Sequence, residues 1–404
     1  MGRILPLRNV IRHYAWGSRT AIPELLRLSS SENLPCAELW MGAHPSAPSR
    51  VMDGGLSVPL DQFIRQQPDM ILGSATAAAF GNTLPFLFKV LAAAEPLSIQ
   101  VHPDSTRARE GFSRENQAGI PLDSPRRNYR DPNHKPECLC ALTPFSLLCG
   151  FRPWSEISAD FSRIFPDPDG QWLNGLVNTG ETDGLKNFFQ RLLAVSGDRV
   201  HPLISRAVAY AGTKRDVDPV CHWIFRLSRY FPDDIMILAP VFLNLLKLAP
   251  GQAIFLPSGV MHSYLEGVGI ELMASSDNVL RGGLTSKHID KDELMRLLDF
   301  TATKPRLVSP IEKGCEGIYE TGAREFVLSV IRVKSGQPCL PAHQGRVSIL
   351  LCVEGEAVIA EQGGEDRTVI KKGDSVLIPA SVGGYHVTGE ALIYKAAVPE
   401  SDSQ

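Results

Sequence analysis

An amide, an imidazole and a carboxylate lie close together in one part of the chain, and all three side chains can bind a metal ion. Side chains alternate between the two faces of an extended strand, so Ser98, Gln100 and His102 share one face while the apolar residues between them take the other. Two metal-binding side chains on one strand face need only one or two further ligands from elsewhere in the chain to complete a metal site. Glu137 and the distant His262 are the natural candidates. The spacing therefore predicts a metal site inside a β-structure.

The donor types narrow the choice of metal without fixing it. Mixed nitrogen and oxygen donors suit Zn²⁺, and they also suit Fe²⁺, Mn²⁺ or Co²⁺. A lone histidine is more often a hydrogen-bonded core or surface residue than a ligand. His102 is favoured as a ligand because Gln100 precedes it by two residues on the same predicted face.

Composition and charge set broad limits on fold and partners. With 404 residues and 44% apolar residues, the chain should form two or three packed units. A net charge of −3 without like-charge runs predicts neither a nucleic acid nor a membrane as partner. No segment approaches the roughly 20 apolar residues that span a bilayer, and the start lacks an export signal. We expect a cytoplasmic monomer.

The eight cysteines are dispersed along the chain, which predicts reduced thiols rather than a disulfide framework. Cys138 and Cys140 lie in an apolar stretch. Free cysteine is often a small core residue, so we expect both to pack in a buried strand rather than to take part in metal or redox chemistry.

The hydrophobic periodicity changes twice along the chain. Residues 1 to about 150 are short apolar segments punctuated by Pro and Gly, which is typical of an all-β unit with several loops. Residues 152–240 instead contain an amphipathic stripe with helical spacing, for which Asp183 is a candidate N-cap, and the segment 202–208 also resembles a helix. The stripe consists of Leu185, Phe188, Phe189, Leu192 and Leu193. After Pro250 the β-pattern returns.

A phrase in the returning β-segment recurs near the end of the chain. Gly251 begins a turn, a short apolar strand, a second turn and then His262, and Gly373 begins a similar phrase in which Gly384 takes the place of the histidine. The fold class predicted is mainly β with an α-helical insert, formed by two related β-barrel units and a helical domain. The predicted catalytic barrel is discontinuous (1–151 and 241–310), the helical insert is 152–240, and the C-terminal barrel (311–404) lacks metal ligands.

Longer segments resemble a known family. The pattern Gly-x5-Pro-x-Gly-x2-His resembles the second conserved motif of the cupin superfamily, which implies that the two predicted barrels are cupin-like (jelly-roll) barrels. Several further segments, in the same order and over most of the chain, resemble type I mannose-6-phosphate isomerases (phosphomannose isomerases). These segments are Asn9–Ser18, Ala37–His44, Pro96–Asp104, Asn128–Glu137 and Glu271–Thr285.

The resemblance implies a reaction and a set of site residues. The family interconverts mannose 6-phosphate and fructose 6-phosphate with one bound zinc, so a sugar phosphate is the expected partner. Carried over by position, the zinc ligands are Gln100, His102, Glu137 and His262. The active-site arginine falls on Arg281, and Lys89 and Lys135 match lysines that line the substrate pocket.

Aldose–ketose isomerisation needs three kinds of group. A metal stabilises negative charge on the two sugar oxygens of a cis-enediol intermediate, fixed cations hold the phosphate, and a positioned base moves the proton. Arginine titrates above about pH 12, so Arg281 suits phosphate or enediolate binding better than base catalysis. The candidates for proton transfer are Glu271, Asp277, His134 and Lys135, and Glu271 is preferred.

One departure from the family and two alternatives remain open. Ser105 stands where many relatives carry a lysine, so phosphate affinity could rely on Arg107 or Arg109 instead. An iron-dependent cupin oxygenase is disfavoured by Gln100 and by the basic residues expected around the pocket. A non-catalytic sugar-phosphate-binding cupin is the other alternative, and binding without turnover would distinguish it.

Overall fold

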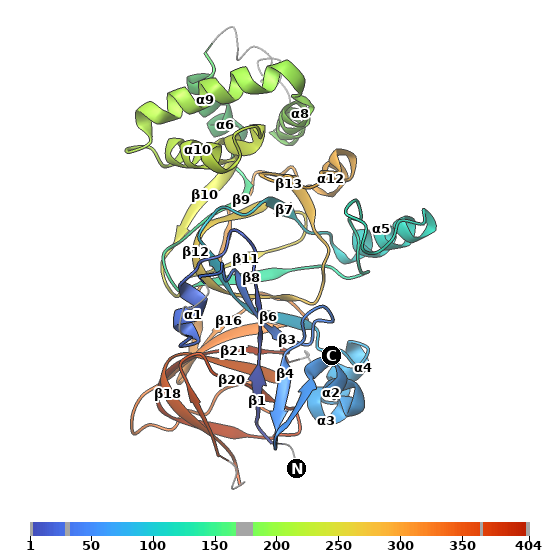
Figure 1. Ribbon diagram of the computed structural model, residues 1–404, viewed down its shortest axis with the longest axis vertical. Coiled ribbons are helices and arrows are strands. Elements are labelled where there is room, and N and C mark those ends of the chain that lie inside the picture. The colour runs from blue at the N-terminus through green and yellow to red at the C-terminus, as the bar shows by residue number, and fades with distance from the viewer. Residues whose placement is uncertain (1–2, 29–32, 167–180, 364–366, 401–404) are drawn as a thin grey trace.

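The computed structural model describes residues 3–28, 33–166, 181–363 and 367–400. Two large β-sheets and a group of helices follow one another along the long axis of the molecule (Figure 1). Mainly β-structure with a helical segment is therefore confirmed as the fold class. None of the described helices is long and apolar enough to span a membrane.

The first sheet contains the segments expected to bind metal, and β12 is its central strand. This strand pairs antiparallel with β6, β7, β8 and β9, so residues from two distant parts of the chain, 86–101 and 137–151, meet along it. The described strands of this sheet are β2 (Val10–Arg12), β3 (Glu38–Gly42), β6 (Phe86–Ala93), β7 (Ile99–Val101), β8 (Glu137–Ala141), β9 (Phe145–Phe151), β10 (Leu243–Leu248), β11 (Ala253–Leu256), β12 (His262–Ala274), β13 (Leu280–Gly283) and β14 (Arg306–Val308).

The second sheet combines the two ends of the chain. Its described strands are β1 (Leu5–Arg8), β4 (Arg50–Asp53), β5 (Leu56–Pro59), β15 (Ile311–Lys313), β16 (Glu316–Tyr319), β17 (Val327–Val333), β18 (Ser348–Glu361), β19 (Arg367–Lys371), β20 (Ser375–Ile378) and β21 (Tyr385–Ala397). Strand β1 pairs with β20 on one side and with β4 on the other. The predicted bounds differ from the sheets at this point, because β1, β4 and β5 fall within 1–151 but complete the sheet of the C-terminal segment.

The predicted helical segment forms the end of the molecule that lies beyond the first sheet (Figure 1). Its described helices are α6 (Trp154–Ile164), α8 (Glu181–Ala194), α9 (Val200–Lys214) and α10 (Pro219–Tyr230), with the short helices η1 (Gly197–Arg199), η2 (Ile235–Leu238) and α11 (Ala239–Phe242). All five residues of the predicted apolar stripe are buried on α8. Asp183 lies inside the first turn of α8 rather than at its N-cap, so that detail of the prediction is wrong.

The expectation of an all-β unit before residue 150 is also wrong, because short helices lie between the strands. They are α1 (Ala21–Leu25), α2 (Leu60–Gln66), α3 (Pro68–Leu72), α4 (Ser74–Ala79) and α5 (Ser105–Gln117), and a later helix, α12 (Lys291–Leu297), packs beside β13. Some of the Pro and Gly residues in this part of the chain mark helix ends instead of loops. Pro68 occupies the first turn of α3, and Gly73 follows its last residue with a φ of 80°.

The repeated phrase forms equivalent strands in the two sheets. β11 and β20 each contain four buried residues, and β12 and β21 each contain 13 residues.

The second sheet has a buried ion pair, in which Lys395 Nζ lies 2.7 Å from Glu316 Oε1 and both side chains are almost fully inaccessible. The backbone N–H of Ala342 and the Ser329 hydroxyl also donate to Glu316. The charges of this pair are therefore compensated and hydrogen-bonded.

Two of the eight cysteines contradict the expectation of reduced thiols. Cys315 and Cys339 form a disulfide with a Cα–Cα distance of 5.8 Å. Cys138 and Cys140 are fully buried on β8, as expected for strand packing. Burial raises the pKa of both thiols, which keeps them protonated and unreactive.

Candidate metal centre and active site

Paired strand ends bring the candidate ligands together. Gln100 lies on β7, where its Cα is paired with His262 of β12 on one side and with Arg281 of β13 on the other. His102 follows β7 directly, and Glu137 is the first residue of β8. Three segments that are far apart in sequence, each with a candidate ligand, therefore meet at one point of the first sheet.

A glycine turn connects two of these segments. Gly259 has a φ of 80°, in the left-handed region that other residues rarely adopt, and its N–H donates to the carbonyl of His102 at 2.9 Å. The chain then enters β12 at His262. Gly259 thus fixes the distance between the two histidine-bearing segments.

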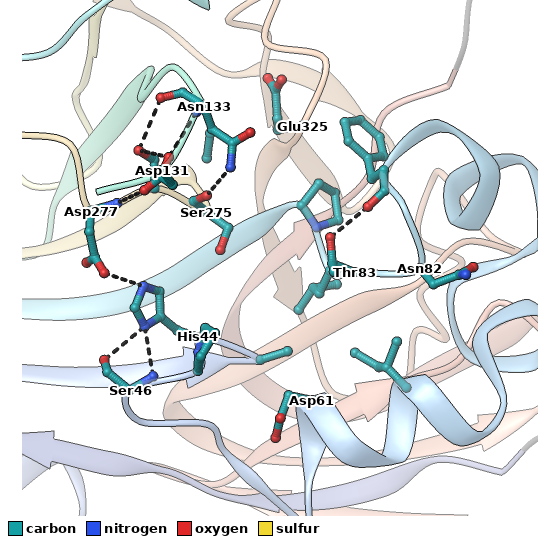
Figure 2. Close-up of a pocket in the computed structure, with 18 of the residues that line it drawn as sticks. His44, Ser46, Asp61, Asn82, Thr83, Asp131, Asn133, Ser275, Asp277 and Glu325 are labelled. Atoms are coloured by element: carbon teal, nitrogen blue, oxygen red, sulfur yellow. Dashed lines mark hydrogen bonds and ion pairs between the residues drawn. The ribbon is translucent and has the colours of Figure 1, made fainter. Parts of the chain in front are cut away.

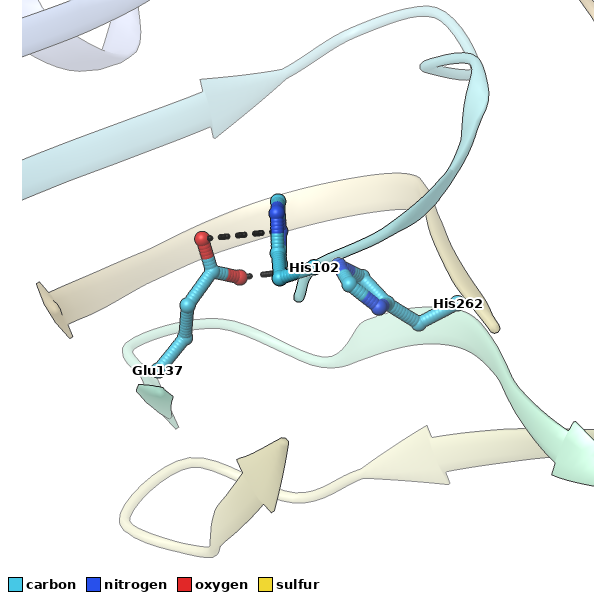
Figure 3. Close-up of side chains that lie close together, drawn as sticks. All are labelled: His102, Glu137 and His262. Atoms are coloured by element: carbon cyan, nitrogen blue, oxygen red, sulfur yellow. Dashed lines mark ion pairs between the residues drawn. The ribbon is translucent and has the colours of Figure 1, made fainter. Parts of the chain in front are cut away.

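Both imidazoles turn toward the carboxylate of Glu137 (Figure 3). His102 Nε2 lies 3.3 Å from Glu137 Oε1, and His262 Nε2 lies 3.5 Å from Glu137 Oε2. All three side chains are buried, and their ligand atoms lie within 4.8 Å of one another. Among the described residues, this is the group of three that could hold one ion.

The hydrogen bonds of the two rings make this cluster suited to a cation. His102 Nδ1 donates to the carbonyl of Asn278 at 2.7 Å, and His262 Nδ1 donates to the carbonyl of Val260 at 3.0 Å. A carbonyl only accepts, so in the neutral rings both Nε2 atoms present lone pairs to the carboxylate. Burial, followed by the charge of Lys135, lowers the pKa of His102 to about 4, which disfavours a bridging proton. The Nε2 of His102 is also buried without a hydrogen-bond partner. The donor set therefore fits a metal cation.

A row of charged and aromatic side chains borders the cluster. Lys89 and Glu271 are directly paired across β6 and β12, and Lys89 Nζ lies 2.9 Å from Glu271 Oε2 and 3.5 Å from Glu38 Oε1. Trp40 donates from its indole N–H to Glu38 at 2.8 Å, and its ring lies under the Lys89 ammonium. Burial raises the pKa of Glu271 despite the charge of Lys89.

A cavity of about 60 Å³ adjoins the metal cluster. Lys135 lies on its wall, with Nζ 3.1 Å from Glu137 Oε1. Burial alone would raise the pKa of Glu137, but Lys135 and His102 hold it well below its ordinary value. The remaining lining residues that carry polar side chains are Glu38, Lys89, Ser98, Gln100, His262, Ser263, Tyr264 and Glu271.

Three cations, Arg281, Arg130 and Lys287, lie within range of one another near β13. Arg281, on β13, is paired through its Cα with Gln100, and its charged neighbour is Arg130. The same two arginines act on Lys287. Burial is the main cause that lowers the pKa of Arg281 and of Lys287, with the neighbouring positive charges adding to it. Mutual repulsion within this group favours the binding of an anion.

Two of the predicted proton-transfer residues lie elsewhere. Asp277 and His134 line a larger cavity of about 810 Å³, and of the described residues none lines both cavities. In Figure 2 the Asp277 carboxylate points toward His44, whose Nε2 lies 3.4 Å from Asp277 Oδ2. His134 pairs with Glu325 of the C-terminal segment at 2.8 Å. The structure therefore places Glu271 and Lys135 on the cavity that adjoins the metal cluster, and Asp277 and His134 on the larger one, where Asp277 is still within range of the charges of Lys135 and Arg130.

The side chains near Ser105 are engaged in local structure. Ser105 begins α5, and Asp104 caps this helix by accepting from the N–H of Arg107 at 2.8 Å. The Arg107 guanidinium lies 3.3 Å from the Asp104 carboxylate and 3.4 Å from the carbonyl of Leu297. Arg107 therefore has partners of its own and is not a free replacement for the missing lysine.

Comparisons with known proteins show the family to which the chain belongs. The phosphomannose isomerase type I catalytic domain matches residues 4–154, and the mannose-6-phosphate isomerase cupin domain matches residues 319–397. Mannose-6-phosphate isomerase from Salmonella typhimurium is 40% identical over 389 residues, which are 95% of this chain and 96% of that protein. The chain belongs to the type I phosphomannose isomerase family. The prediction of the family is thus confirmed.

Other members of the family extend this similarity to mammals and to solved structures. Human mannose-6-phosphate isomerase is 34% identical over 411 residues, with 94% of each chain covered. A zinc-bound mannose 6-phosphate isomerase structure has a TM-score of 0.89 at 38% identity, and it covers 98% of this chain and 100% of its own. A Salmonella typhimurium structure with fructose 6-phosphate and zinc has a TM-score of 0.88 at the same identity and coverage. The family is therefore one of zinc-binding enzymes.

Sequence reasoning missed several polar residues around the site. Tyr264 follows His262 by two residues on β12, and Glu38 precedes Trp40 by two on β3, so strand alternation would have placed each pair on one face. Lys287 and Arg130 lie in irregular segments. These irregular segments have no hydrophobic periodicity, so the sequence pattern does not predict that the two side chains lie near Arg281.

Proposed function

We propose that this protein interconverts D-mannose 6-phosphate and D-fructose 6-phosphate in a zinc-dependent aldose–ketose isomerisation, and that it acts in carbohydrate metabolism. The observation that carries the proposal is the buried cluster of two imidazole lone pairs and one carboxylate, bordered by lysines and arginines. Relatives from both bacteria and mammals are named mannose-6-phosphate isomerase.

Gln100, His102, Glu137 and His262 are the residues proposed to hold the zinc ion. The three charged or imidazole donors face one another, and Gln100 lines the same cavity. When bound, zinc supplies a Lewis acid that stabilises negative charge on the sugar oxygens. The hydrogen bonds from both Nδ1 atoms keep the Nε2 lone pairs directed at that position.

Glu271 is proposed as the base that moves the proton between carbons 2 and 1 through a cis-enediol. Burial raises its pKa, which suits a carboxylate that must accept a proton and return it. Lys89 stays charged beside it, since the carboxylates of Glu271 and Glu38 outweigh the effect of burial and raise the Lys89 pKa. Lys135 is the second candidate in the same cavity. Asp277 remains a proposal of lower rank because it faces the larger cavity.

Arg281, Arg130 and Lys287 are proposed to bind the phosphate group. Their positive charges lie together beside β13, and each raises the local potential for an anion. A phosphate held there would place the sugar toward Gln100, because Arg281 and Gln100 are paired across β13 and β7.

An assay of the purified protein tests the reaction directly. Fructose 6-phosphate formation from mannose 6-phosphate is measured before chelation, after chelation and after zinc is restored. We expect turnover that is lost with the chelator and returns with zinc. No turnover in fully zinc-loaded protein would contradict the proposal, and sugar-phosphate binding without turnover would support the non-catalytic alternative.

Substitution of the central cation tests the phosphate assignment. Arg281→Ala is expected to raise KM for mannose 6-phosphate by about 10- to 100-fold, because a charge-assisted hydrogen bond to the phosphate is lost. Zinc content should not change. Arg107→Ala is the matched control, since Arg107 is engaged by Asp104, and its KM should stay within about twofold of the wild-type value. An unchanged KM in Arg281→Ala would contradict the assignment.

The layout proposed for the chain is two cupin-like barrels and a helical domain. The support is the correspondence of strands between the two sheets: β11 has the length and burial of its repeat β20, and β12 has the length of β21. In this layout the first barrel provides the metal site, and the Glu316–Lys395 pair fills the interior of the second. The three N-terminal strands β1, β4 and β5, which form one edge of the second sheet, are then assigned to the second barrel.

A further inference from the structure

Asn278 lies between β12 and β13 and is fully buried. Its backbone carbonyl accepts the Nδ1–H of His102 at 2.7 Å. This bond determines which nitrogen of His102 carries the proton, and so leaves the Nε2 lone pair free for a metal ion. The position of the Asn278 backbone therefore bears directly on one proposed ligand.

The side chain of Asn278 binds a different segment. Its Nδ2 donates to the carbonyls of Asp131 and Asn133 at 2.7 and 2.8 Å, and its Oδ1 accepts from the N–H groups of Arg130 and Asp131 at 2.7 and 3.2 Å. The amide thus uses both its donor and its acceptor on the backbone of one loop. That loop runs directly into Glu137.

The chain that follows Asn278 leads to the phosphate group of residues. Arg281 lies three residues further on, paired with Gln100 across β13 and β7. We infer that Asn278 is a positioning residue for the metal centre: it holds the acceptor of His102, the loop that leads to Glu137 and the strand of Arg281 in one arrangement. The inference rests on the proposed zinc site.

Loss of the Asn278 side-chain amide should weaken zinc binding as well as lower the free energy of unfolding. Asn278→Ala leaves four backbone polar contacts of the loop unmade in a buried place, so the loop and the Asn278 backbone must both move to find new partners. The tautomer of His102 is then no longer fixed, and neither is the position of the Glu137 carboxylate at the metal site. Partners of this kind, one step removed from the metal, typically contribute 10- to 100-fold to metal affinity.

Zinc affinity of the full-length protein is the measurement. Metal-free wild type, Asn278→Ala and Asn9→Ala are titrated with zinc against a chelating dye, and urea denaturation of each metal-free protein is recorded alongside. Asn9 is the matched control, because its amide also bridges two segments, Ser49 and Ser375, but in the second sheet's surroundings. We expect about 10- to 100-fold weaker zinc binding in Asn278→Ala and a change of less than about threefold in Asn9→Ala.

The outcomes separate this inference from the proposed function. A wild-type protein that binds no zinc would overturn both. Wild type that binds zinc beside an Asn278→Ala variant of equal affinity, or an equal loss in Asn9→Ala, would overturn the inference alone. Should Asn278→Ala not fold, Asn278→Ser replaces it, since the hydroxyl retains one hydrogen-bonding group. Zinc binding as tight as in wild type would then overturn the inference.

Discussion

Glu137→Gln is expected to abolish zinc binding and to lower kcat/KM for mannose 6-phosphate by about 10³-fold. Glu137 is the carboxylate that both His102 and His262 face, so its charge is what binds a cation between the two lone pairs. The glutamine amide has the same shape without the charge. Its N–H can donate to an imidazole lone pair, which fills the site with a hydrogen bond instead of a metal ion.

Zinc content by elemental analysis and the isomerase assay check this result. The zinc-free variant should also be less stable than zinc-free wild type, because the buried Lys135 ammonium loses the charge of its carboxylate partner at 3.1 Å. Glu38→Gln is the matched control: Glu38 lines the same cavity but contacts Trp40 and Lys89 rather than the histidines, so zinc should be retained. A Glu137→Gln protein with one zinc per chain would disprove the ligand assignment.

Lys89→Met is expected to destabilise the protein by about 3 to 5 kcal/mol. Lys89 is buried between Glu271 and Glu38, at 2.9 and 3.5 Å. Methionine keeps much of the side-chain volume, so packing changes little, but two buried carboxylates lose their counter-charge. Activity should fall as well, since the charge that holds Glu271 in place is gone. Urea denaturation followed by tryptophan fluorescence measures the loss.

A double substitution separates charge from packing in this result. In Lys89→Met/Glu271→Gln the nearer carboxylate is neutral, while Glu38 keeps its hydrogen bond from Trp40. The double variant should therefore recover at least about 1 kcal/mol relative to Lys89→Met alone. A Lys89→Met protein whose free energy of unfolding lies within about 1 kcal/mol of wild type would show that the Lys89 charge does not stabilise the fold.

Much of the metal cluster could be predicted from local pattern. Strand alternation places Gln100 and His102 on one face, and the glycine turn before His262 marks the entry into the next strand. Pattern could not assign the proton-transfer candidates, because His134 and Lys135 are adjacent in sequence and line different cavities. A shift of one residue reverses the face, and the sequence of a loop does not report which face is inside.

The fold was predictable where periodicity is long and was missed where segments are short. The stripe on α8 repeats over two turns and predicts a helix. Helices of five to seven residues, such as α2 and α3, repeat too few times to be told from loops. The disulfide between Cys315 and Cys339 depends on the approach of two segments 24 residues apart in sequence, which composition does not report.

The pairing of β1 with β20 has a consequence for the order in which the chain is made. Asn9, beside β1, binds Ser375 of β20, and these residues are 366 positions apart. At about 5 to 20 residues per second, a ribosome needs roughly 20 to 70 s to supply the second strand after the first. During synthesis one edge of β1 is therefore exposed to other chains. Pro6, which lacks a backbone donor, and the charged Arg8 both lie within this four-residue strand and limit unwanted pairing while its partner is still being synthesised.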